Sequence, residues 1–507
     1  MVINYTLPGE KPALSIAFAP CFLQWGYTME FLEIFDTETP LKTLDEYCSR
    51  AKPGADKINY QTFRAKYSVE LPLIKDKIKA HTYKFTRFEV MLKVKKHYKL
   101  PRLIFKSTMR DRFVSKLMAE YMNAFYAKQK YIPTKTRDSI LSQISETVKE
   151  EVDGKYKYNY FFRLDINSYF DSINRHLLLD QLESDGFDST FIYLVNKLFF
   201  TMDLSMDRPS GCGVPQGISV SSLLAERYLK QLEEKYSSPM YNQTIRLFRY
   251  VDDIFVLTTD ENTHRKIKQS TVFELQSTYG LSVNPDKITE GRLDVDKTDF
   301  LGISISNRKL AVSDVQFERV IKQLNDLFIW YRRVSKTKQH PYYSNTNRAI
   351  EALIERLNLL ITGYKYTNSN NQPGKYGWIQ TSLPPQIDDI DALRRLDKHV
   401  GALIRTHIKS QELRELINER RKSFYVAFLK CKFSNNEDGY ILDREKTSND
   451  EMYRIVKNLS MVDLKHDLKE TYDQKAFEKV VGETLYSHFR KTLYIANREL
   501  TSDILYW

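Results

Sequence analysis

Two adjacent carboxylates, Asp252 and Asp253, separate two apolar runs in IRLFRYVDDIFVLTTD (245–260). Neighbouring side chains of a β-strand point to opposite faces, so the two can serve one site only where the backbone reverses. The tip of a β-hairpin provides such a reversal. The alternative is an ordinary solvated turn, because Asp is a favoured turn residue.

A third carboxylate, Asp165, ends the apolar run of FFRLDI (161–166). Two carboxylates from different strands, Asp165 and Asp252, are the bridging ligands that two Mg²⁺ ions about 3.5–4 Å apart require. Hard cations prefer oxygen ligands, which agrees with the absence of His and Cys from these motifs. Such a site supports phosphoryl transfer, in which positioning and charge neutralisation supply most of the catalysis. The alternative for Asp165 is a helix N-cap at a strand–helix junction.

A glycine-rich segment, GCGVPQGISVSS (211–222), lies between these carboxylates in the chain. Gly213, Pro215 and Gly217 predict a compact loop whose backbone can approach a ligand closely. Gln216 offers a planar amide for a base or sugar edge. By itself this segment could equally be an ordinary turn. Its position between the two acidic motifs is what favours a ligand-binding loop.

The acidic pair needs its context, because a YxDD match arises by chance roughly 0.2 times in a chain of this composition. A second pair, Asp388-Asp389, serves as an internal control. It lacks flanking strands, and we interpret it as a solvated helix start.

The elements that must position these residues follow from periodicity. Strands are predicted over 161–166, on both sides of the acidic pair, and over FLGISIS (300–306), and helices over 110–129 and 219–236. These elements describe an α+β sheet domain with helices on one face. After about residue 310 the pattern becomes mostly helical, with helices over 315–334, 352–364 and 391–408, a polar loop at 365–377 and a cap at 447–450.

Composition sets the broad class. A length of 507 residues predicts two or three domains, and the net charge of +12 is concentrated between Lys84 and Lys130, where thirteen Lys or Arg face three acids. A phosphate-facing surface accounts for this concentration better than a solvated one. Four widely spaced cysteines argue against a disulfide framework or structural zinc. The apolar stretch 13–25 fits a signal peptide poorly, and no run reaches membrane-spanning length, so a cytoplasmic protein is expected.

The motif order resembles that of reverse transcriptases over about residues 95–305: a basic segment, RLDINSYFD, GVPQG, YVDD, GLSVNPDKIT and FLG. The resemblance implies that Asp165, Asp252 and Asp253 are the catalytic metal-binding carboxylates. It adds the carbonyl of Ile166 as a further ligand and implies two Mg²⁺ ions.

The resemblance also implies a nucleotide-binding set. Phe170 matches the aromatic gate that excludes a ribose 2′-OH, although a core aromatic is the alternative. Lys287 matches the lysine near the departing pyrophosphate, although it could be a surface lysine.

The segment PRLIFKSTMRDR (101–112) is similar to the fingers motif of bacterial reverse transcriptases. Arg102 matches the arginine that grips the incoming triphosphate, a task that suits the guanidinium fork. Lys95 is a second clamp candidate, and Gln216 with Gly217 completes the set.

The fold that the resemblance implies is a reverse-transcriptase-like α+β fingers and palm, as in right-hand polymerases, followed by a mostly α-helical C-terminal domain. We expect an N-terminal extension over 1–83, fingers over 84–150, the palm with the polymerase active site over 151–310, and an α-helical domain in place of, or extending, a thumb over 311–507.

A reverse transcriptase core followed by about 200 helical residues is most similar to the abortive-infection group of bacterial defence enzymes, in its prophage-borne form. That resemblance implies DNA synthesis from deoxynucleoside triphosphates without a template, started on a tyrosine hydroxyl of the protein, in a homo-oligomer. The product would then be DNA attached to the protein. The priming tyrosine is unknown, and Tyr27 and Tyr47, ahead of the core, are nominal candidates.

Two other hypotheses stay open. One is a templated RNA-dependent DNA polymerase of retron or group II intron type. The other is a catalytically idle nucleic-acid-binding or scaffold protein built on a polymerase fold, against which the presence of Asp165 and Asp252 argues.

Overall fold

The computed structural model describes residues 30–50, 52–93, 101–129, 135–207, 210–336, 346–367, 373–433, 439–460, 485–487 and 489–496. The chain forms two compact units. Unit 1 comprises Met1–Lys135, Ile166–Lys235 and Thr271–Val283; unit 2 comprises Thr136–Asp165, Tyr236–Ser270 and Asn284–Trp507. The four expected domains stay a prediction, and the units divide the expected palm between them.

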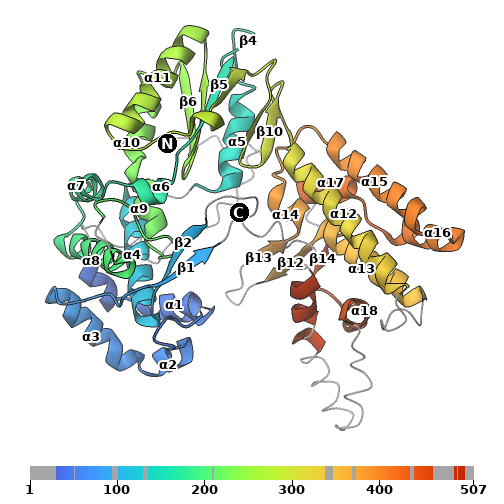
Figure 1. Cartoon of the computed structure of the whole chain (residues 1–507), viewed down its shortest axis with the longest axis horizontal. Coiled ribbons are helices and arrows are strands. Elements are labelled where there is room, and N and C mark those ends of the chain that lie inside the picture. The colour runs from blue at the N-terminus through green and yellow to red at the C-terminus, as the bar shows by residue number, and fades with distance from the viewer. Residues whose placement is uncertain are drawn as a thin grey trace, which may run out of the picture. The chain divides into compact units, whose positions relative to one another are not determined.

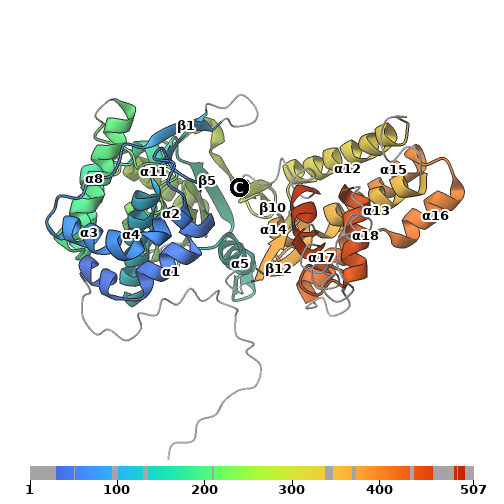
Figure 2. The same cartoon turned by 90° about the horizontal axis from the view of Figure 1, so that it is seen from below.

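Unit 1 is largely helical (Figures 1 and 2). Its elements are η1 (Phe31–Asp36), α1 (Thr39–Glu46), η2 (Cys48–Arg50), α2 (Tyr60–Ala65), α3 (Tyr67–Lys79), β1 (Glu89–Lys93), β2 (Arg102–Lys106), α4 (Met109–Lys128), α6 (Tyr169–Ser172), α7 (Arg175–Asp185), α8 (Ser189–Met206), α9 (Ser221–Tyr228) and most of α10 (Lys230–Ser237).

The helix predicted over 110–129 is confirmed as α4. Its N-cap Thr108 accepts a hydrogen bond from the Asp111 backbone N–H, which satisfies one donor of the first turn. Phe113, Leu117 and Tyr121 are buried, as their helical spacing predicts.

The helix predicted over 219–236 is broken at Leu229 into α9 and α10. The Gln181 side-chain amide donates to the Tyr228 carbonyl at 3.2 Å. This contact gives the Tyr228 carbonyl a partner outside the helical ladder, and sequence periodicity carries no information about it.

The centre of unit 2 is a four-stranded antiparallel sheet in the order β6-β7-β5-β8. Its strands are β5 (Tyr160–Asp165), β6 (Ile245–Tyr250), β7 (Asp253–Thr258) and β8 (Thr289–Arg292). These bounds confirm the strands predicted around Asp165 and around the acidic pair.

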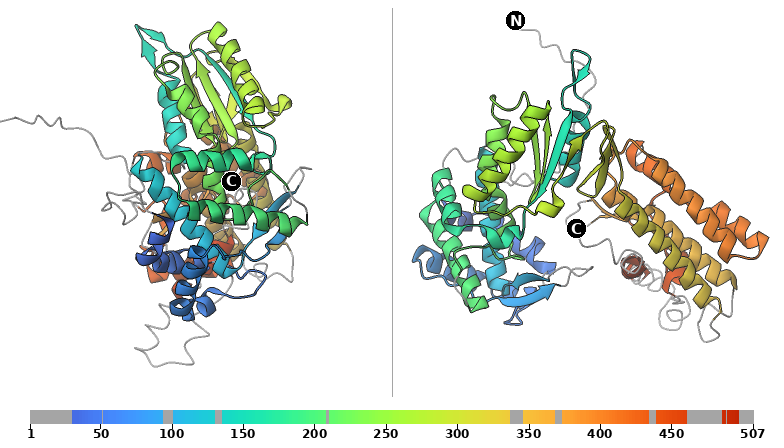
Figure 3. Two further views of the ribbon diagram at one scale, coloured as in Figure 1. Left: turned by 90° about the vertical axis from the view of Figure 1, so that its left-hand side faces the viewer. Right: turned by 45° about the horizontal axis from the view of Figure 1, so that its top comes forward.

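Helices cover both faces of this sheet, not one as expected (Figure 3). On one face, His264 of α11 (Glu261–Ser277) contacts the rings of Tyr160 and Phe162. On the other, α5 (Arg137–Thr147) shares one hydrophobic cluster with Phe161. Alternate residues of β5 therefore serve opposite layers.

The strand predicted over 300–306 is two strands, β9 (Thr298–Phe300) and β10 (Ile303–Ser306), in a second sheet with β11 (Lys309–Val312). Leu301 and Gly302 between them both have positive φ, 50° and 76°. Such a turn needs a residue like glycine, and the single Gly in FLGISIS was the available signal.

The C-terminal part of unit 2 is mostly helical, as predicted. Its helices are α12 (Asp314–Val334), α13 (Thr346–Thr362), α14 (Trp378–Ser382), α15 (Asp391–His407), α16 (Gln411–Arg420), α17 (Phe424–Phe433) and α18 (Asn449–Ser460). The remaining elements of unit 2 are β3 (Glu151–Val152), β4 (Lys155–Tyr156), η3 (Pro285–Lys287), β12 (Tyr364–Thr367), β13 (Pro373–Tyr376) and β14 (Leu442–Asp443).

The polar loop predicted at 365–377 is instead a hairpin, in which β12 pairs antiparallel with β13. The Tyr366 and Tyr376 rings stack at 5.2 Å, and Gly374 lies so close under Tyr366 that a Cβ would come within 2.1 Å of the ring. Cross-strand aromatic packing thus stabilises strands whose composition is that of a loop.

A single hydrophobic cluster joins the sheet of unit 2 to its C-terminal helices. It contains Phe161 and Phe255 of the sheet together with Leu324 of α12 and Leu396 of α15. The hydrophobic core of unit 2 is therefore continuous across the domain boundary that was expected at residue 310.

No helix among the described residues is long and apolar enough to span a membrane.

Candidate active site

Asp165 and Asp253 lie opposite each other at the ends of β5 and β7. They are direct partners in the antiparallel register, and directly opposed side chains project on the same face of a sheet. The same face carries the buried Phe161 and Phe255 further along the strands. The face of the sheet that carries these buried rings therefore ends in the two carboxylates, where β5 ends and β7 begins.

Asp252 lies in the turn that joins β6 to β7. Tyr250 pairs with Asp253, so Val251 and Asp252 form a two-residue hairpin loop, as the sequence predicts. Val251 has φ +58°, a conformation that is rare for a β-branched residue. Arg249, buried, donates from Nη1 to the Val251 carbonyl at 3.1 Å.

Arg163 binds Asp253 through two parallel hydrogen bonds. Its Nε donates to Oδ1 and its Nη2 to Oδ2, both at 2.7 Å, and its Nη1 donates to the Asp299 carbonyl at 2.6 Å. The guanidinium also lies 6.0 Å from the Phe300 ring centroid. Both oxygens of Asp253 are thereby fixed in a bidentate pair.

Two neighbouring carboxylates act on the Asp253 carboxyl. Burial raises the pKa of Asp253, the hydrogen bonds and charge of Arg163 oppose the shift, and the charges of Asp165 and Asp252 add to it. Asp165 is its register partner and Asp252 its neighbour in the chain.

Lys287 is bonded to Asp165 Oδ2. It ends η3, which begins at Pro285 after Asn284, and the Asn284 N–H donates to the Asp165 carbonyl at 3.1 Å. A residue far away in sequence thus reaches the carboxylate, and the lysine side chain is 49% exposed. Its role near the departing pyrophosphate stays a prediction.

The donor set fits magnesium bound in part by substrate. Among the described residues, no three His, Cys, Asp or Glu side chains form a group that could hold a metal ion by themselves. Mg²⁺ is usually bound by one or two carboxylates together with water and substrate phosphates. The half-buried Asp165 and Asp252 supply such carboxylates, whereas the Asp253 oxygens are engaged by Arg163.

In unit 1, the glycine-rich loop packs against strand β2. The Phe105 N–H donates to the Gln216 carbonyl at 2.7 Å. Gly217 has φ +99°, and a Cβ there would come within 2.7 Å of the Phe105 carbonyl oxygen. The loop backbone therefore closely approaches the strand that begins at Arg102, and the predicted approach to a ligand stays a prediction.

Gly217→Ala is expected to destabilise the protein by about 3 kcal/mol, because the methyl group combines a positive φ with a clash against backbone. The matched control is Gly211→Ala in the same loop, where a Cβ meets nothing within 4 Å. Urea unfolding should show a lower midpoint for the first variant and an unchanged one for the second. Equal midpoints would contradict the packing described.

Phe170 lies beside the same loop, in α6. Its carbonyl accepts from the Val214 N–H at 2.8 Å, and its side chain is half-buried. The neighbouring Tyr169 is the core aromatic: it is buried and its hydroxyl donates to the Ala225 carbonyl. Phe170 is therefore less buried than Tyr169, and its role as a gate stays a prediction.

The remaining predicted residues are placed separately. Arg102 is exposed at the start of β2, opposite Lys93 of β1. Lys95 lies outside the described residues. Ile166 follows Asp165 directly and forms a bridge with Val283. Within the basic segment, Lys106 pairs with Glu89 and Lys116 with Glu120, so these two acids are bound by cations of the same segment.

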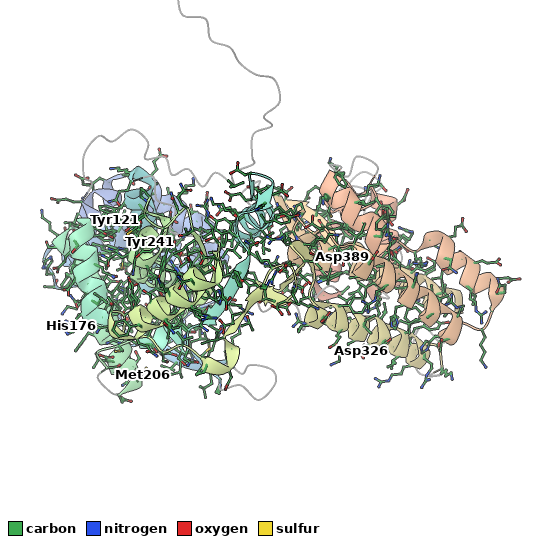
Figure 4. The ribbon with its side chains drawn as sticks, turned by 90° about the horizontal axis from the view of Figure 1, so that it is seen from above. Tyr121, His176, Met206, Tyr241, Asp326 and Asp389 are labelled. Atoms are coloured by element: carbon green, nitrogen blue, oxygen red, sulfur yellow. The ribbon has the colours of Figure 1, made fainter. Side chains whose placement is uncertain are left out.

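The control pair behaves as the sequence predicts. The Asp389 carboxylate accepts from the Asp391 N–H at 2.9 Å at the start of α15, and Asp388 pairs with Lys149. Figure 4 labels Asp389 among the C-terminal elements.

Sequence reasoning missed Arg163 and Arg249. The signal for Arg163 was its position two residues before Asp165 in FFRLDI, which places both on one face of a strand. Arg249 precedes the acidic pair in RYVDD, but nothing in the sequence marks a donor to the turn.

Comparison with known proteins gives a match to one family. Residues 94–305 match the model of the reverse transcriptase (RNA-dependent DNA polymerase) family. Protein YkfC of Escherichia coli strain K12 is 26% identical over 197 residues, which cover 37% of this chain and 51% of that protein. The chain thus matches about half the length of this curated relative.

Solved telomerase structures align with this chain at low similarity. Telomerase of Candida albicans with a fragment of telomeric RNA aligns with 84% of this chain and 68% of its own at 11% identity and a TM-score of 0.39. A truncated apo telomerase of Candida tropicalis aligns with 45% of this chain and 55% of its own at 16% identity and a TM-score of 0.35. Neither score supports a functional argument. The family match, together with the sheets of the predicted palm region and the mostly helical part after residue 313, confirms the predicted fold class.

Proposed function

We propose that this chain, with a reverse-transcriptase domain over residues 94–305, is a Mg²⁺-dependent polymerase that makes DNA from deoxynucleoside triphosphates. The observation that carries the proposal is the edge of the sheet in unit 2. There Asp165 and Asp253 oppose each other, Asp252 occupies the adjoining turn, and Lys287 contacts Asp165.

In this proposal Asp165, Asp252 and the Ile166 carbonyl hold Mg²⁺, and Asp253, oriented by Arg163, completes the acidic set. Bound Mg²⁺ would neutralise the phosphate charge and lower the pKa of the attacking hydroxyl. Lys287 supplies a mobile positive charge for the departing pyrophosphate. Arg102, Lys95, Phe170, Gln216 and Gly217 are the proposed nucleotide-binding residues.

We further propose that synthesis needs no template and starts on a tyrosine hydroxyl, that the protein works as a homo-oligomer, and that it acts in abortive-infection defence against phage. The support is the resemblance of a reverse transcriptase core followed by a long helical region. Tyr47 is a priming candidate because its ring is 41% exposed and its hydroxyl hydrogen-bonds only Ser219 Oγ among the described residues, at 2.9 Å. Tyr27 lies outside the described residues.

The decisive experiment incubates purified protein with Mg²⁺ and labelled deoxynucleotides and no added nucleic acid. We expect labelled DNA that stays on the protein in a denaturing gel and is released by protease. Tyr47→Phe tests the candidate primer, since it retains the ring and removes only the hydroxyl. Synthesis that appears only after a template is supplied would refute the untemplated mechanism and favour the templated polymerase of retron or intron type.

The catalytically idle alternative has its own test. If the Asp165→Ala variant retains full activity in a phage-defence assay in cells, the polymerase site is dispensable and the protein is a scaffold.

Phe170→Ala is expected to raise incorporation of ribonucleotides relative to deoxynucleotides about tenfold or more, because a shortened side chain leaves room for the 2′-OH. The measurement is the ratio of kcat/KM for the two sugars. Tyr169→Phe is the control: it loses the hydroxyl bonded to Ala225 and should keep the sugar preference. An unchanged preference in Phe170→Ala would assign that ring to packing alone.

A further inference from the structure

We propose that helices α12 and α15 form a binding surface for a nucleic-acid strand, outside the matched reverse-transcriptase region. The surface, named the α12–α15 basic face, consists of Lys322, Arg332 and Lys336 on the α12 side and Arg395, Lys398, Arg405 and Lys409 on the α15 side. This inference rests on the proposed polymerase function for the identity of its ligand.

The two helices pack along much of their length. The Arg395 guanidinium lies 4.4 Å from the Phe317 ring centroid, the His399 ring nitrogen bonds Asn325 Oδ1 at 3.0 Å, and the His407 and Phe328 rings are 5.6 Å apart. Residue numbers therefore increase in the same direction along both helices, which lie side by side in Figure 1.

Helical spacing gathers the cations on the solvent side of this pair. On α15, Arg395, Lys398 and Arg405 follow at intervals of three and seven residues, which is one side of a helix. The opposite side carries the buried Leu393, Leu396, Val400 and Ile404. Lys409 lies two residues past the end of this helix. On α12, Lys322 and Arg332 are ten residues apart, which is about 15 Å at 1.5 Å per residue, and Lys336 lies two residues past the helix end.

These cations are exposed and lack acidic partners. All seven are exposed, and none makes an ion pair with a carboxylate in the part of the chain that the structure describes. Other basic residues of the same region differ: Arg394 pairs with Asp391, and Arg420 with Glu351.

The neighbouring carboxylates leave the face positive. Asp314, Glu318 and Asp326 are exposed on α12, where Figure 4 labels Asp326. Asp314 pairs with Lys297, and Asp391 of α15 pairs with Arg394. Seven cations against these four acids leave a surplus of three. The pKa of His407 is lowered by burial and then by the charge of Arg332, which agrees with a positive local potential.

A polynucleotide is the occupant that this chemistry favours. Like charges gathered on one surface repel one another unless a polyanion offsets them, and a phosphate backbone supplies charge at regular intervals. The ring contact with Phe317 holds the Arg395 guanidinium in a defined plane, which suits a phosphate. The product or the template of a polymerase is a polynucleotide of this kind.

The test measures binding of fluorescein-labelled 30-nucleotide oligo-dT and of an RNA of the same length to the full-length protein. Fluorescence anisotropy is followed across a series of salt concentrations, without nucleotides. The test variant is K322Q/K398Q/K409Q. The control variant is K309Q/K375Q/K446Q, which removes the same charge from exposed lysines in the strand region of unit 2.

We expect the test variant to bind about tenfold more weakly at low salt. The slope of log K against log salt should fall by about 2, since each lost phosphate contact in a single strand removes about 0.7. The control should change neither quantity. The arm that binds more tightly, DNA or RNA, identifies the natural strand.

Two results would overturn the proposal: an equal loss in the test and control variants, or equal displacement of the oligonucleotide by poly-glutamate, which carries charge without phosphates. The outcome is separable from the proposed function, because the oligonucleotide is supplied. Asp252→Asn should bind it normally while making no DNA. A failed synthesis assay therefore leaves the binding result standing, and a failed binding assay leaves the synthesis result standing.

Discussion

Asp252→Asn is expected to lower the rate of deoxynucleotide incorporation about a thousandfold. The amide keeps the size of the side chain and removes the negative charge, so about 4 kcal/mol of charge stabilisation by the bound metal is lost, at about 1.4 kcal/mol per factor of ten. The half-saturating Mg²⁺ concentration should also rise. Initial rates measured across a Mg²⁺ titration separate the two effects.

The matched control is Asp389→Asn, which makes the same change in the other Asp-Asp pair. Asp389 lies one residue before Ile390, the N-cap of α15, and accepts from the Asp391 N–H; the side-chain oxygen of Asn can accept the same hydrogen bond. Its rate and Mg²⁺ dependence should equal those of the parent protein. If Asp252→Asn also retained the parent rate, the carboxylate assignment would be wrong.

Arg163→Gln is expected to destabilise the protein by about 3 kcal/mol, because it leaves the Asp253 carboxylate half-buried without its bidentate partner. The side chains of this pair are 27% and 15% exposed, so water compensates only in part. Incorporation should fall as well, because Asp253 loses its fixed orientation between Asp165 and Asp252. Denaturant unfolding measures the first effect and initial rates the second.

The double variant Arg163→Gln/Asp253→Asn distinguishes this explanation from a general packing defect. Removing both charges leaves two neutral groups that can hydrogen-bond, so about 2 kcal/mol of the lost stability should return. Activity should stay low, because the acidic set is still incomplete. A double variant that loses the sum of both single effects would mean that the pair does not act as a unit.

Local sequence was sufficient for the elements that carry the site. Asp165 stands at the end of an apolar run and Asp252-Asp253 between two such runs, and a strand and a hairpin follow from alternation and burial alone. The same holds for α12, where Val320, Leu324, Leu327 and Tyr331 are all buried. The helix predicted over 219–236 failed at the break between α9 and α10, where the side chain of Gln181, distant in sequence, binds the Tyr228 carbonyl.

What the sequence determined by itself was the type and order of the acidic residues, the strands that carry them and the helical character of the last third. The tertiary structure alone decided that Asp165 faces Asp253, that Lys287 reaches Asp165 and that Arg163 engages both oxygens of Asp253. The physical reason is range. Periodicity is a property of neighbouring residues, whereas the strand order β6-β7-β5-β8 and the pairing of buried charges depend on groups that only the folded chain brings within hydrogen-bond distance.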